Sequence, residues 1–372
     1  MIHLPILPFT LVTTSSSDLV RGRVTFRFAA KRGFCGGVER ALRLAGEATA
    51  SASPGRVFLT SPILHNPAVN EDLRRKGVRF LSEDEDLWRG LGADDVVILP
   101  AFGAVPEICE RVKALGCKLV DTTCGSVVFV WKQVEKLAEG GFTVLYHGRR
   151  GHEETVATLE RCRRRGKGRE VAPYVLLQSI EDAKRVADFF QGRLDGQSLL
   201  ASLAETSPGL DPDRDLRRVG FASQTTMLAT ETTRIEDLLR SAHAARQDRV
   251  ASDRGDFAAQ PTLCRATQER QDALQELLAS KVDVVIVVGG YDSSNSGHLC
   301  QQADDVLPAF HVEGPQDVLG PDTIRHRSPR DGSIVTTRRW LPPGPVTVGV
   351  TSGASTPEFV LEAVVERVAS LA

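Results

Sequence analysis

Three of the seven cysteines stand in the same sequence setting, which suggests that they act together. Cys35, Cys124 and Cys264 each precede a helical pattern, then a β-branched strand pattern, then a polar loop. Three similar domains that each send one cysteine loop to a shared axis would bring three thiolates together. Such a set can hold a four-iron four-sulfur cluster and leave one iron without a protein ligand.

The alternative for these cysteines is a structural role, because a free cysteine most often serves as a small buried hydrophobe. We expect that role for the four cysteines that lack the repeated setting, which are Cys109, Cys117, Cys162 and Cys300.

The loop that ends each repeat carries groups that can bind an anion. His65 lies 30 residues after Cys35, Glu154 lies 30 residues after Cys124, and Ser294 lies 30 residues after Cys264. Each loop follows a strand pattern and precedes a helix, where unpaired backbone N–H groups and the helix dipole favour an anion. A single Ser, Thr, Asn or Asp there would more often be a helix cap. Because several loops carry such groups and only one has a prominent carboxylate, we predict a diphosphate site with one proton donor.

Alternating strand and helix patterns must position these loops. Apolar runs predict strands at Val96–Leu99, Thr143–Tyr146, Val282–Val288 and Val346–Val350. Apolar residues spaced three and four apart predict helices at Val38–Ala50, Val127–Ala138, Gln268–Ala279 and Phe359–Val368. This alternation predicts an α/β fold with mainly parallel sheets, whose ligands bind at the carboxyl ends of the strands.

The repeats divide the chain into three expected domains. We expect a frayed leader over residues 1–23, a first α/β domain over 24–120, and a second over 121–262. The second carries loops or an insertion near 161–169 and 194–218, and the third covers 263–372 with a C-terminal strand and helix.

Composition narrows the function classes. The chain has 46 basic and 48 acidic residues and a net charge of -2. A charge so close to zero creates no overall electrostatic attraction to nucleic acid or to an anionic membrane surface. No apolar run approaches the roughly 18 to 20 residues that a spanning helix needs. The odd cysteine number and the lack of any CxxC pair argue against a disulfide framework, so we expect a cytoplasmic protein.

A set of ordered motifs resembles the LytB or IspH family, the 4-hydroxy-3-methylbut-2-enyl diphosphate reductases of the methylerythritol phosphate route to isoprenoids. The match covers nearly the whole chain after about Arg23. The segments that carry it are RGFCGGVERAL at Arg32–Leu42, ILHNPAVN at Ile63–Asn70, PAFGA at Pro100–Ala104, DTTC at Asp121–Cys124, HGRRGHEETVAT at His147–Thr158, DPDRDLRRVGFASQTTML at Asp211–Leu228, CRATQERQDA at Cys264–Ala273, GGYDSSNSGHL at Gly289–Leu299 and GPVTVGVTSGASTPE at Gly344–Glu358.

The resemblance implies a cloverleaf of three small α/β domains around a central [4Fe-4S] cluster with ligands Cys35, Cys124 and Cys264. Its open iron would bind the hydroxyl oxygen of the substrate. Two electrons, from a donor such as ferredoxin or flavodoxin, and two protons would remove that oxygen as water, giving isopentenyl and dimethylallyl diphosphate. Carried over by motif, Glu154 would relay protons, Thr225 would lie beside the substrate, and the diphosphate would be held by His65, His152, Ser293, Ser294, Asn295 and Ser355.

Three positions distinguish this chain within the resemblance. Phe102 stands where the shorter subtype has histidine, as in the longer subtype known from photosynthetic organisms. Gly125 follows the second cysteine, where the family usually has proline, and Asp292 replaces the usual asparagine. A carboxylate beside a diphosphate loop is unfavourable unless it is paired or points away.

Two other functions remain open. The first is a divergent paralogue that keeps the cluster and acts as a redox or iron sensor. The second is a nucleotide-binding α/β protein without a cluster, but the chain has no GxxxxGK[ST] loop.

Overall fold

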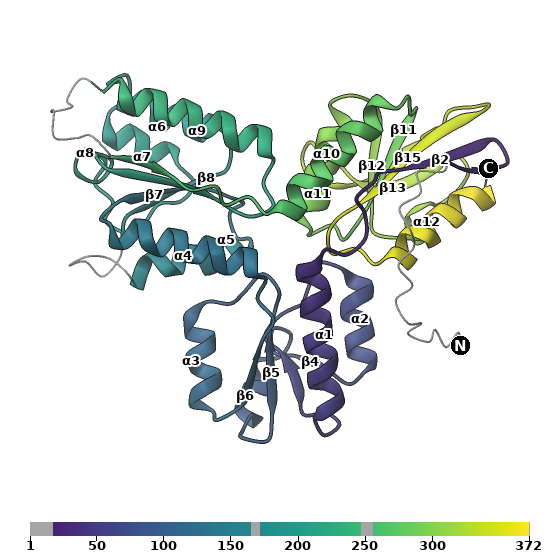
Figure 1. The fold of residues 1–372 in the computed structure, drawn as a ribbon, viewed down its shortest axis with the longest axis horizontal. Helices are drawn as coiled ribbons and strands as arrows, with labels where there is room; N and C mark the ends of the chain where they lie inside the picture. Colours follow the sequence, from purple (N-terminus) through teal and green to yellow (C-terminus); the bar gives the residue numbers. More distant parts are fainter. Residues whose placement is uncertain (1–17, 165–171, 247–255, 372) are drawn as a thin grey trace.

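The computed structural model describes residues 18–164, 172–246 and 256–371 and contains three β-sheets, one in each of three α/β lobes (Figure 1). The lobes lie at the corners of a triangle, and the chain passes between them near the centre. The prediction of three α/β domains with mainly parallel sheets is therefore confirmed. Among the described residues, no helix is both long enough and apolar enough to cross a membrane.

The first sheet is fully parallel and has the order β4-β3-β5-β6. Its strands are β3 (Val57–Leu59), β4 (Arg79–Phe80), β5 (Val96–Leu99) and β6 (Lys118–Asp121). Its helices are α1 (Gly36–Ser51), α2 (Pro67–Arg75), α3 (Pro106–Ala114) and the 3₁₀ helix η1 (Glu85–Gly90). Helix α1 buries Val38, Ala41, Ala45 and Ala48, whose spacing places them on one face against the sheet.

The second sheet is also parallel, with the order β10-β9-β7-β8. Its strands are β7 (Thr143–His147), β8 (Tyr174–Leu177), β9 (Val219–Ser223) and β10 (Phe257–Ala259). Helices α4 (Gly125–Glu139) and α5 (Glu153–Arg164) cover one face, and α6 (Ile180–Phe190) and α9 (Ala229–Ala244) cover the other (Figure 1).

Loops or an insertion were expected near 194–218. The expectation of loops is wrong, because the segment contains α7 (Gly196–Ser202) and α8 (Pro212–Asp215). Asp195 and Asp211 cap these two short helices, so the Asp residues that suggested loops mark helix starts. The basic stretch near 161–169 runs from the end of α5 into residues outside the described part of the chain.

The third sheet has seven strands in the order β1-β2-β15-β11-β12-β13-β14. These are β1 (Leu19–Arg21), β2 (Val24–Phe28), β11 (Val284–Val288), β12 (Ala309–Val312), β13 (Thr323–Arg327), β14 (Ile334–Arg338) and β15 (Val346–Ser352). The four strands β2, β15, β11 and β12 are parallel, and antiparallel strands extend both edges. The helices of this lobe are α10 (Arg265–Ala279), α11 (Ser294–Asp304), α12 (Glu358–Leu371) and η3 (Pro315–Asp317).

The N-terminal boundary expected from the sequence is wrong. Residues 19–21 belong to a strand and not to a leader, and β2 joins the C-terminal sheet and not the first domain. Strand β2 pairs in parallel with β15, from Val24 against Val346 to Phe28 against Val350. Val24 and Phe26 are fully buried in the core of the third lobe, so apolar burial holds the N-terminal strand there.

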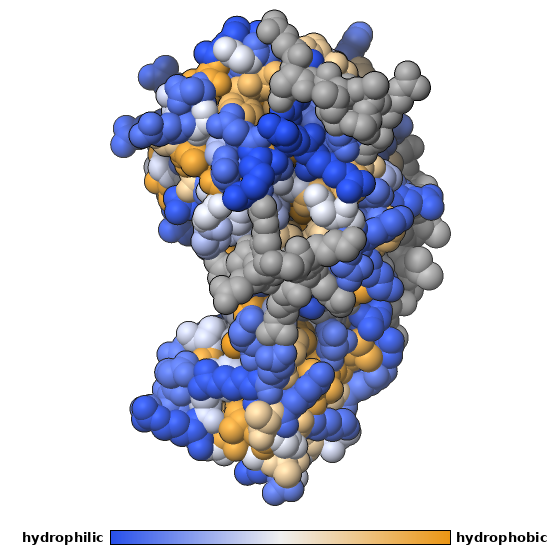
Figure 2. Space-filling model, turned by 90° about the vertical axis from the view of Figure 1, so that its left-hand side faces the viewer, coloured by the Kyte–Doolittle hydropathy of each residue, from blue (hydrophilic) through white to orange (hydrophobic). Residues whose placement is uncertain are grey.

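The face shown in Figure 2 carries the second lobe above and the first lobe below. Hydrophilic residues cover most of it, with hydrophobic residues scattered between them. The outline of this view is indented between the two lobes.

Candidate active site between the three lobes

The three predicted cysteines occupy equivalent places in the three lobes. Cys35, Cys124 and Cys264 each immediately precede a helix, and they are the N-cap residues of α1, α4 and α10. Each backbone N–H donates a hydrogen bond to a distant loop: Cys35 to the Ala354 carbonyl (3.2 Å), Cys124 to that of Ala101 (2.8 Å) and Cys264 to that of Thr225 (3.1 Å). The expected repeat of cysteine, helix, strand and polar loop is confirmed as a structural unit.

The sulfur atoms converge across the lobe boundaries. A Cβ atom built on Gly37 would lie 2.6 Å from the Sγ of Cys124 and 3.8 Å from the Sγ of Cys35. A side chain at position 37 would therefore occupy the space beside two cysteines from different lobes. The three sulfurs do not gather within 4.8 Å of one another, as the ligands of a single ion would. Thiolates of a polynuclear cluster can be farther apart, because they bind different metal atoms.

The surroundings of the cysteines fit an anionic iron–sulfur cluster. All three are partly exposed. Of the four cysteines expected to be buried, Cys117, Cys162 and Cys300 are buried, but Cys109 is partly exposed, so the expectation is wrong for Cys109. Burial raises the pKa of both Cys162 and Cys300 to about 12, so these two stay protonated, as their expected packing role requires. The guanidinium of Arg270, only 4% exposed, is buried within the electrostatic reach of Cys35 and Cys264. A buried cation between thiolates is the charge that a negative cluster needs.

Glu154 is a buried carboxyl group with a single polar partner residue. It is 2% exposed and lies in the first turn of α5. Its Oε1 accepts a hydrogen bond from the backbone N–H of Thr225 (2.8 Å), and its Oε2 accepts one from the Thr225 hydroxyl (2.7 Å). Burial raises the pKa of Glu154 to about 7, although these two hydrogen bonds oppose the rise. The group can therefore hold and release a proton near neutral pH.

Thr225 connects this carboxyl group to a cysteine loop. Its backbone N–H and hydroxyl bind Glu154, while its carbonyl accepts the hydrogen bond from the Cys264 N–H. The short turn after β9 thus fixes the proton-holding group of the second lobe relative to the cysteine of the third. The electrostatic influence of Glu154 on Cys264, which raises the pKa of that thiol after burial itself, reflects the same proximity.

Two histidines from different lobes face each other at the site. The ring of His65 stacks on Phe102, with centroids 4.6 Å apart and planes within 8°, and meets the ring of His152 edge-on at 5.0 Å. Burial lowers the pKa of His65 and lowers that of His152 to about 3, so both rings are neutral at pH 7. The parallel stacking on Phe102 fixes the plane of the His65 ring.

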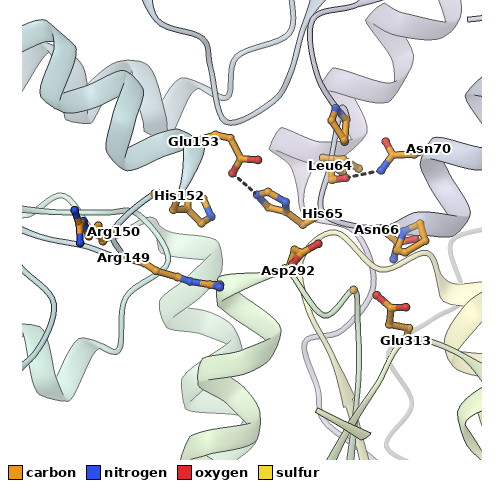
Figure 3. Close-up of a pocket in the computed structure, with 14 residues that line it drawn as sticks. Leu64, His65, Asn66, Asn70, Arg149, Arg150, His152, Glu153, Asp292 and Glu313 are labelled. Atoms are coloured by element: carbon orange, nitrogen blue, oxygen red, sulfur yellow. Dashed lines mark hydrogen bonds and ion pairs between the residues drawn. The ribbon is translucent and has the colours of Figure 1, made fainter. Parts of the chain in front are cut away.

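A pocket of about 320 Å³ opens at these histidines (Figure 3). All three lobes contribute to it, and its lining includes His65 from the first, Arg149 and His152 from the second, and Asp292 from the third. Figure 3 shows the Glu153 carboxylate turned toward His65, with its Oε2 3.4 Å from the His65 Nε2. One ligand atom from each of His65, His152 and Glu153 lies within 4.8 Å of the other two, so this corner could also hold a cation.

The predicted loop of the third lobe continues from Asp292 in the pocket lining and carries buried donors without partners, although Ser293, Ser294, Asn295 and Ser355 are not themselves lining residues. Ser293 is the N-cap of α11 and accepts a hydrogen bond from the Ser296 N–H (3.3 Å). The Ser294 hydroxyl and the Asn295 amide nitrogen are buried without a hydrogen-bond partner. The Asn295 Oδ1 accepts a hydrogen bond from the Ala354 N–H (3.2 Å). Half-buried Ser355 follows Ala354 in the loop after β15. Buried donors without partners are costly, so an anion that accepts from them would be bound favourably.

Comparisons with known proteins agree with this architecture. A family model described as "LytB protein" matches residues 26–369. The chain belongs to the LytB family. It is 42% identical to the 4-hydroxy-3-methylbut-2-enyl diphosphate reductase of Gloeobacter violaceus, over 97% of this chain and 86% of the relative. It is 41% identical to the enzyme of the same name from a Nostoc species, over 95% of this chain and 86% of the relative.

Solved structures show the same LytB fold. The Plasmodium falciparum E-1-hydroxy-2-methyl-but-2-enyl-4-diphosphate reductase superposes with a TM-score of 0.67 at 22% identity, covering 92% of this chain and 86% of that one. A second structure is titled as (E)-4-hydroxy-3-methyl-but-2-enyl diphosphate reductase, the terminal enzyme of the non-mevalonate pathway. It gives a TM-score of 0.55 at 26% identity, covering 93% of this chain and 99% of that one.

Several residues of this candidate site were not predicted from the sequence, among them Arg149, Glu153 and Arg270. Arg149 and Glu153 line the pocket, and Arg270 lies buried beside the cysteine loops. Arg149 and Glu153 flank His152 inside a motif that had been noticed, so their position in that motif was an available signal. For Arg270 the signal was weaker, since a charged residue in a helix is usually exposed.

Proposed function

We propose that this LytB-family protein reductively removes the hydroxyl group of 4-hydroxy-3-methylbut-2-enyl diphosphate. Two electrons and two protons convert the substrate to water and either isopentenyl or dimethylallyl diphosphate. The relatives at 42% and 41% identity bear the name of this activity. The observation that carries the proposal is the chain of contacts from buried Glu154 through Thr225 to Cys264, which places one proton-holding group at the cysteine loops.

The proposed cofactor is a [4Fe-4S] cluster held by Cys35, Cys124 and Cys264. Three thiolates at helix starts, two of them beside Gly37, fit such a group. When bound, the cluster supplies the electrons and an iron that can take the hydroxyl oxygen of the substrate. The glycine at position 37 keeps this space clear, because any side chain there would collide with the Cys124 sulfur.

The proposed diphosphate ligands are His65, His152, Ser293, Ser294, Asn295 and Ser355. Neutral imidazoles, hydroxyls and amide groups can donate hydrogen bonds to phosphate oxygens. The unpartnered Ser294 hydroxyl and Asn295 amide nitrogen support this role. The positive end of α11 begins at the same serines and adds to the attraction.

Glu154 is the proposed source of the proton that lets the hydroxyl oxygen leave. A carboxyl group with a pKa of about 7 is partly protonated at neutral pH and can be protonated again after each turnover. Thr225 holds both carboxyl oxygens and so fixes the direction of the acid. Its hydroxyl, which donates to Glu154, is the proposed contact with the substrate.

Electrons would come from a small carrier protein such as ferredoxin or flavodoxin. The seven cysteines are all unpaired, which supports a reducing, cytoplasmic location as part of this proposal.

The decisive experiment is anaerobic purification, followed by iron and sulfide analysis, cluster spectroscopy and a reductase assay with the diphosphate. We expect a cluster and turnover that depends on a supplied reductant. A cluster-bearing protein without turnover would refute the reductase proposal and favour a sensor. A colourless, iron-free protein would refute the cluster as well.

A further inference from the structure

Arg270 is a buried cation that ties two cysteine loops together. It lies on α10 and is 4% exposed, on the same buried stripe as Thr267 and Leu274. Its Nη2 donates to the carbonyl of Gly33 (2.7 Å), two residues before Cys35. Its Nη1 donates to the carbonyl of Ala266 (3.0 Å), two residues after Cys264. The guanidinium therefore bridges the first and third lobes at their cysteines.

Among the described residues, no carboxylate forms an ion pair with Arg270, although Glu269 attracts the guanidinium less strongly than Cys35 and Cys264 do. Its neighbour Glu269 pairs with exposed Arg265 instead (2.8 Å). The Nε–H of Arg270 is buried and has no hydrogen-bond partner. After burial itself, the largest electrostatic influences on the guanidinium are the attractive ones of Cys35 and Cys264. Burying an unpaired cation is costly, so a persistent negative charge should lie next to it.

We propose that Arg270 is the counter-ion of the iron–sulfur cluster and raises its reduction potential. The inference rests on the proposed function, because the negative charge is that of the cluster with its three thiolates. Arg270 is a positioning residue: it holds the loops of Cys35 and Cys264, and its fixed charge acts on the cluster without contacting the substrate.

The direction of the effect follows from charge balance. One-electron reduction makes the cluster more negative by one charge and moves no other charge in the protein. A fixed positive charge stabilises the reduced form more than the oxidised form, and a low local dielectric strengthens the attraction. Removing the charge should therefore make the cluster harder to reduce.

Three variants separate charge from hydrogen bonding. Arg270→Gln removes the charge, and Arg270→Lys keeps the charge but loses the planar two-point bridge. Arg40→Gln is the matched control, because exposed Arg40 also bridges two lobes, from α1 to the Thr123 carbonyl (3.2 Å) next to Cys124. The readouts are iron content, the cluster's spectrum, and its midpoint potential from an anaerobic redox titration of each holoprotein.

We expect Arg270→Gln to lower the equilibrium constant for one-electron reduction at least tenfold, a potential shift of about 59 mV to more negative values. Arg270→Lys and Arg40→Gln should stay within threefold of the unmodified protein. An unshifted potential in a fully loaded Arg270→Gln protein would overturn the proposal. If Arg270→Gln cannot hold a cluster, Arg270→Lys decides: a loaded cluster at the normal potential supports the counter-ion role, and cluster loss or a shift overturns it. Absence of any cluster in the unmodified protein would instead refute the proposed function.

Discussion

Replacing Glu154 by Gln should separate proton delivery from the architecture of the site. Glutamine can keep both contacts with Thr225, because its Oε1 can accept from the Thr225 N–H and its amide can donate to the Thr225 hydroxyl. It cannot supply a proton. A positioned general acid typically contributes about 10² to 10⁴-fold, so we expect kcat to fall by at least about a hundredfold while the cluster is retained.

The pH dependence gives this prediction a second test. With a pKa of about 7, Glu154 is mostly protonated at pH 6 and mostly ionised at pH 8. If the protonated form is the active one, kcat of the unmodified protein should fall as pH rises through 7, and this fall should be missing in Glu154→Gln.

The free energy of unfolding should also depend on the protonation state of Glu154. Because the folded-state pKa is raised above its ordinary value of 4.5, the contribution of Glu154 to stability is lost as pH rises from about 4.5 to 7, so the unmodified protein should lose stability over this range relative to Glu154→Gln. The loss should be on the order of 3 kcal/mol.

The assay compares kcat, KM, iron content and thermal midpoint for Glu154→Gln and for Glu160→Gln. Glu160 lies on the same helix α5 at a partly exposed position, so its variant controls for removing a carboxylate from that helix. Glu153 is not a neutral control, because it lines the pocket beside His65. Turnover within a few-fold of normal in iron-loaded Glu154→Gln would refute the assignment of the proton donor.

Five further substitutions test other parts of the protein. Cys264→Ser should lose most of the iron, whereas Cys300→Ser should keep it, since Cys300 is a buried packing residue. The measurement is the iron content of both proteins. The reverse pattern would show that the ligand assignment is wrong. His152→Gln should raise KM about tenfold, roughly 1.4 kcal/mol, and an unchanged KM would remove His152 from the diphosphate site. Asp292→Asn should lower KM or leave it unchanged, because it removes a negative charge from the pocket lining; a clear rise in KM would show a positive role for the carboxylate. Gly125→Pro should raise the free energy of unfolding, measured by chemical denaturation, by about 0.4 to 1 kcal/mol. Proline suits the first position of a helix, and a Cβ atom at position 125 would meet nothing within 4 Å. Destabilisation would mean that glycine is required at this position.

Features set by local sequence could be predicted. The cysteine repeat was correct in all three copies because helix starts, strand patterns and polar loops are short-range signals. Asn66 caps a helix that begins at Pro67, as its residue type and position indicate, and its side chain accepts from the Val69 N–H. The loops that follow β3 and β7 bring His65 and His152 together, although no local pattern encodes the 5.0 Å separation of their ring centroids.

Features set by distant pairing could not be predicted. Strand β2 reads as the start of the first domain, yet it pairs with β15, which lies more than 300 residues later in the chain. A strand's apolar pattern shows that it is buried and leaves its partner unspecified. The assignment of residues 19–28 to the third lobe therefore depends on tertiary packing of Val24 and Phe26.

Arg270 shows how a departure from pattern carries functional information. Helix α10 buries Thr267, Leu274 and Leu277, and this stripe continues through position 270, where an apolar residue would be the ordinary choice. An arginine at that place costs stability in a protein without a counter-ion and costs little in one with a negative group beside it. The residue type is therefore explained by what binds at the cysteines. The same reasoning applies to the unpaired donors of Ser294 and Asn295, whose burial is costly until a phosphate accepts from them. In the proposed function, the buried and unpartnered groups of Arg270, Ser294 and Asn295 would face the cluster or the diphosphate.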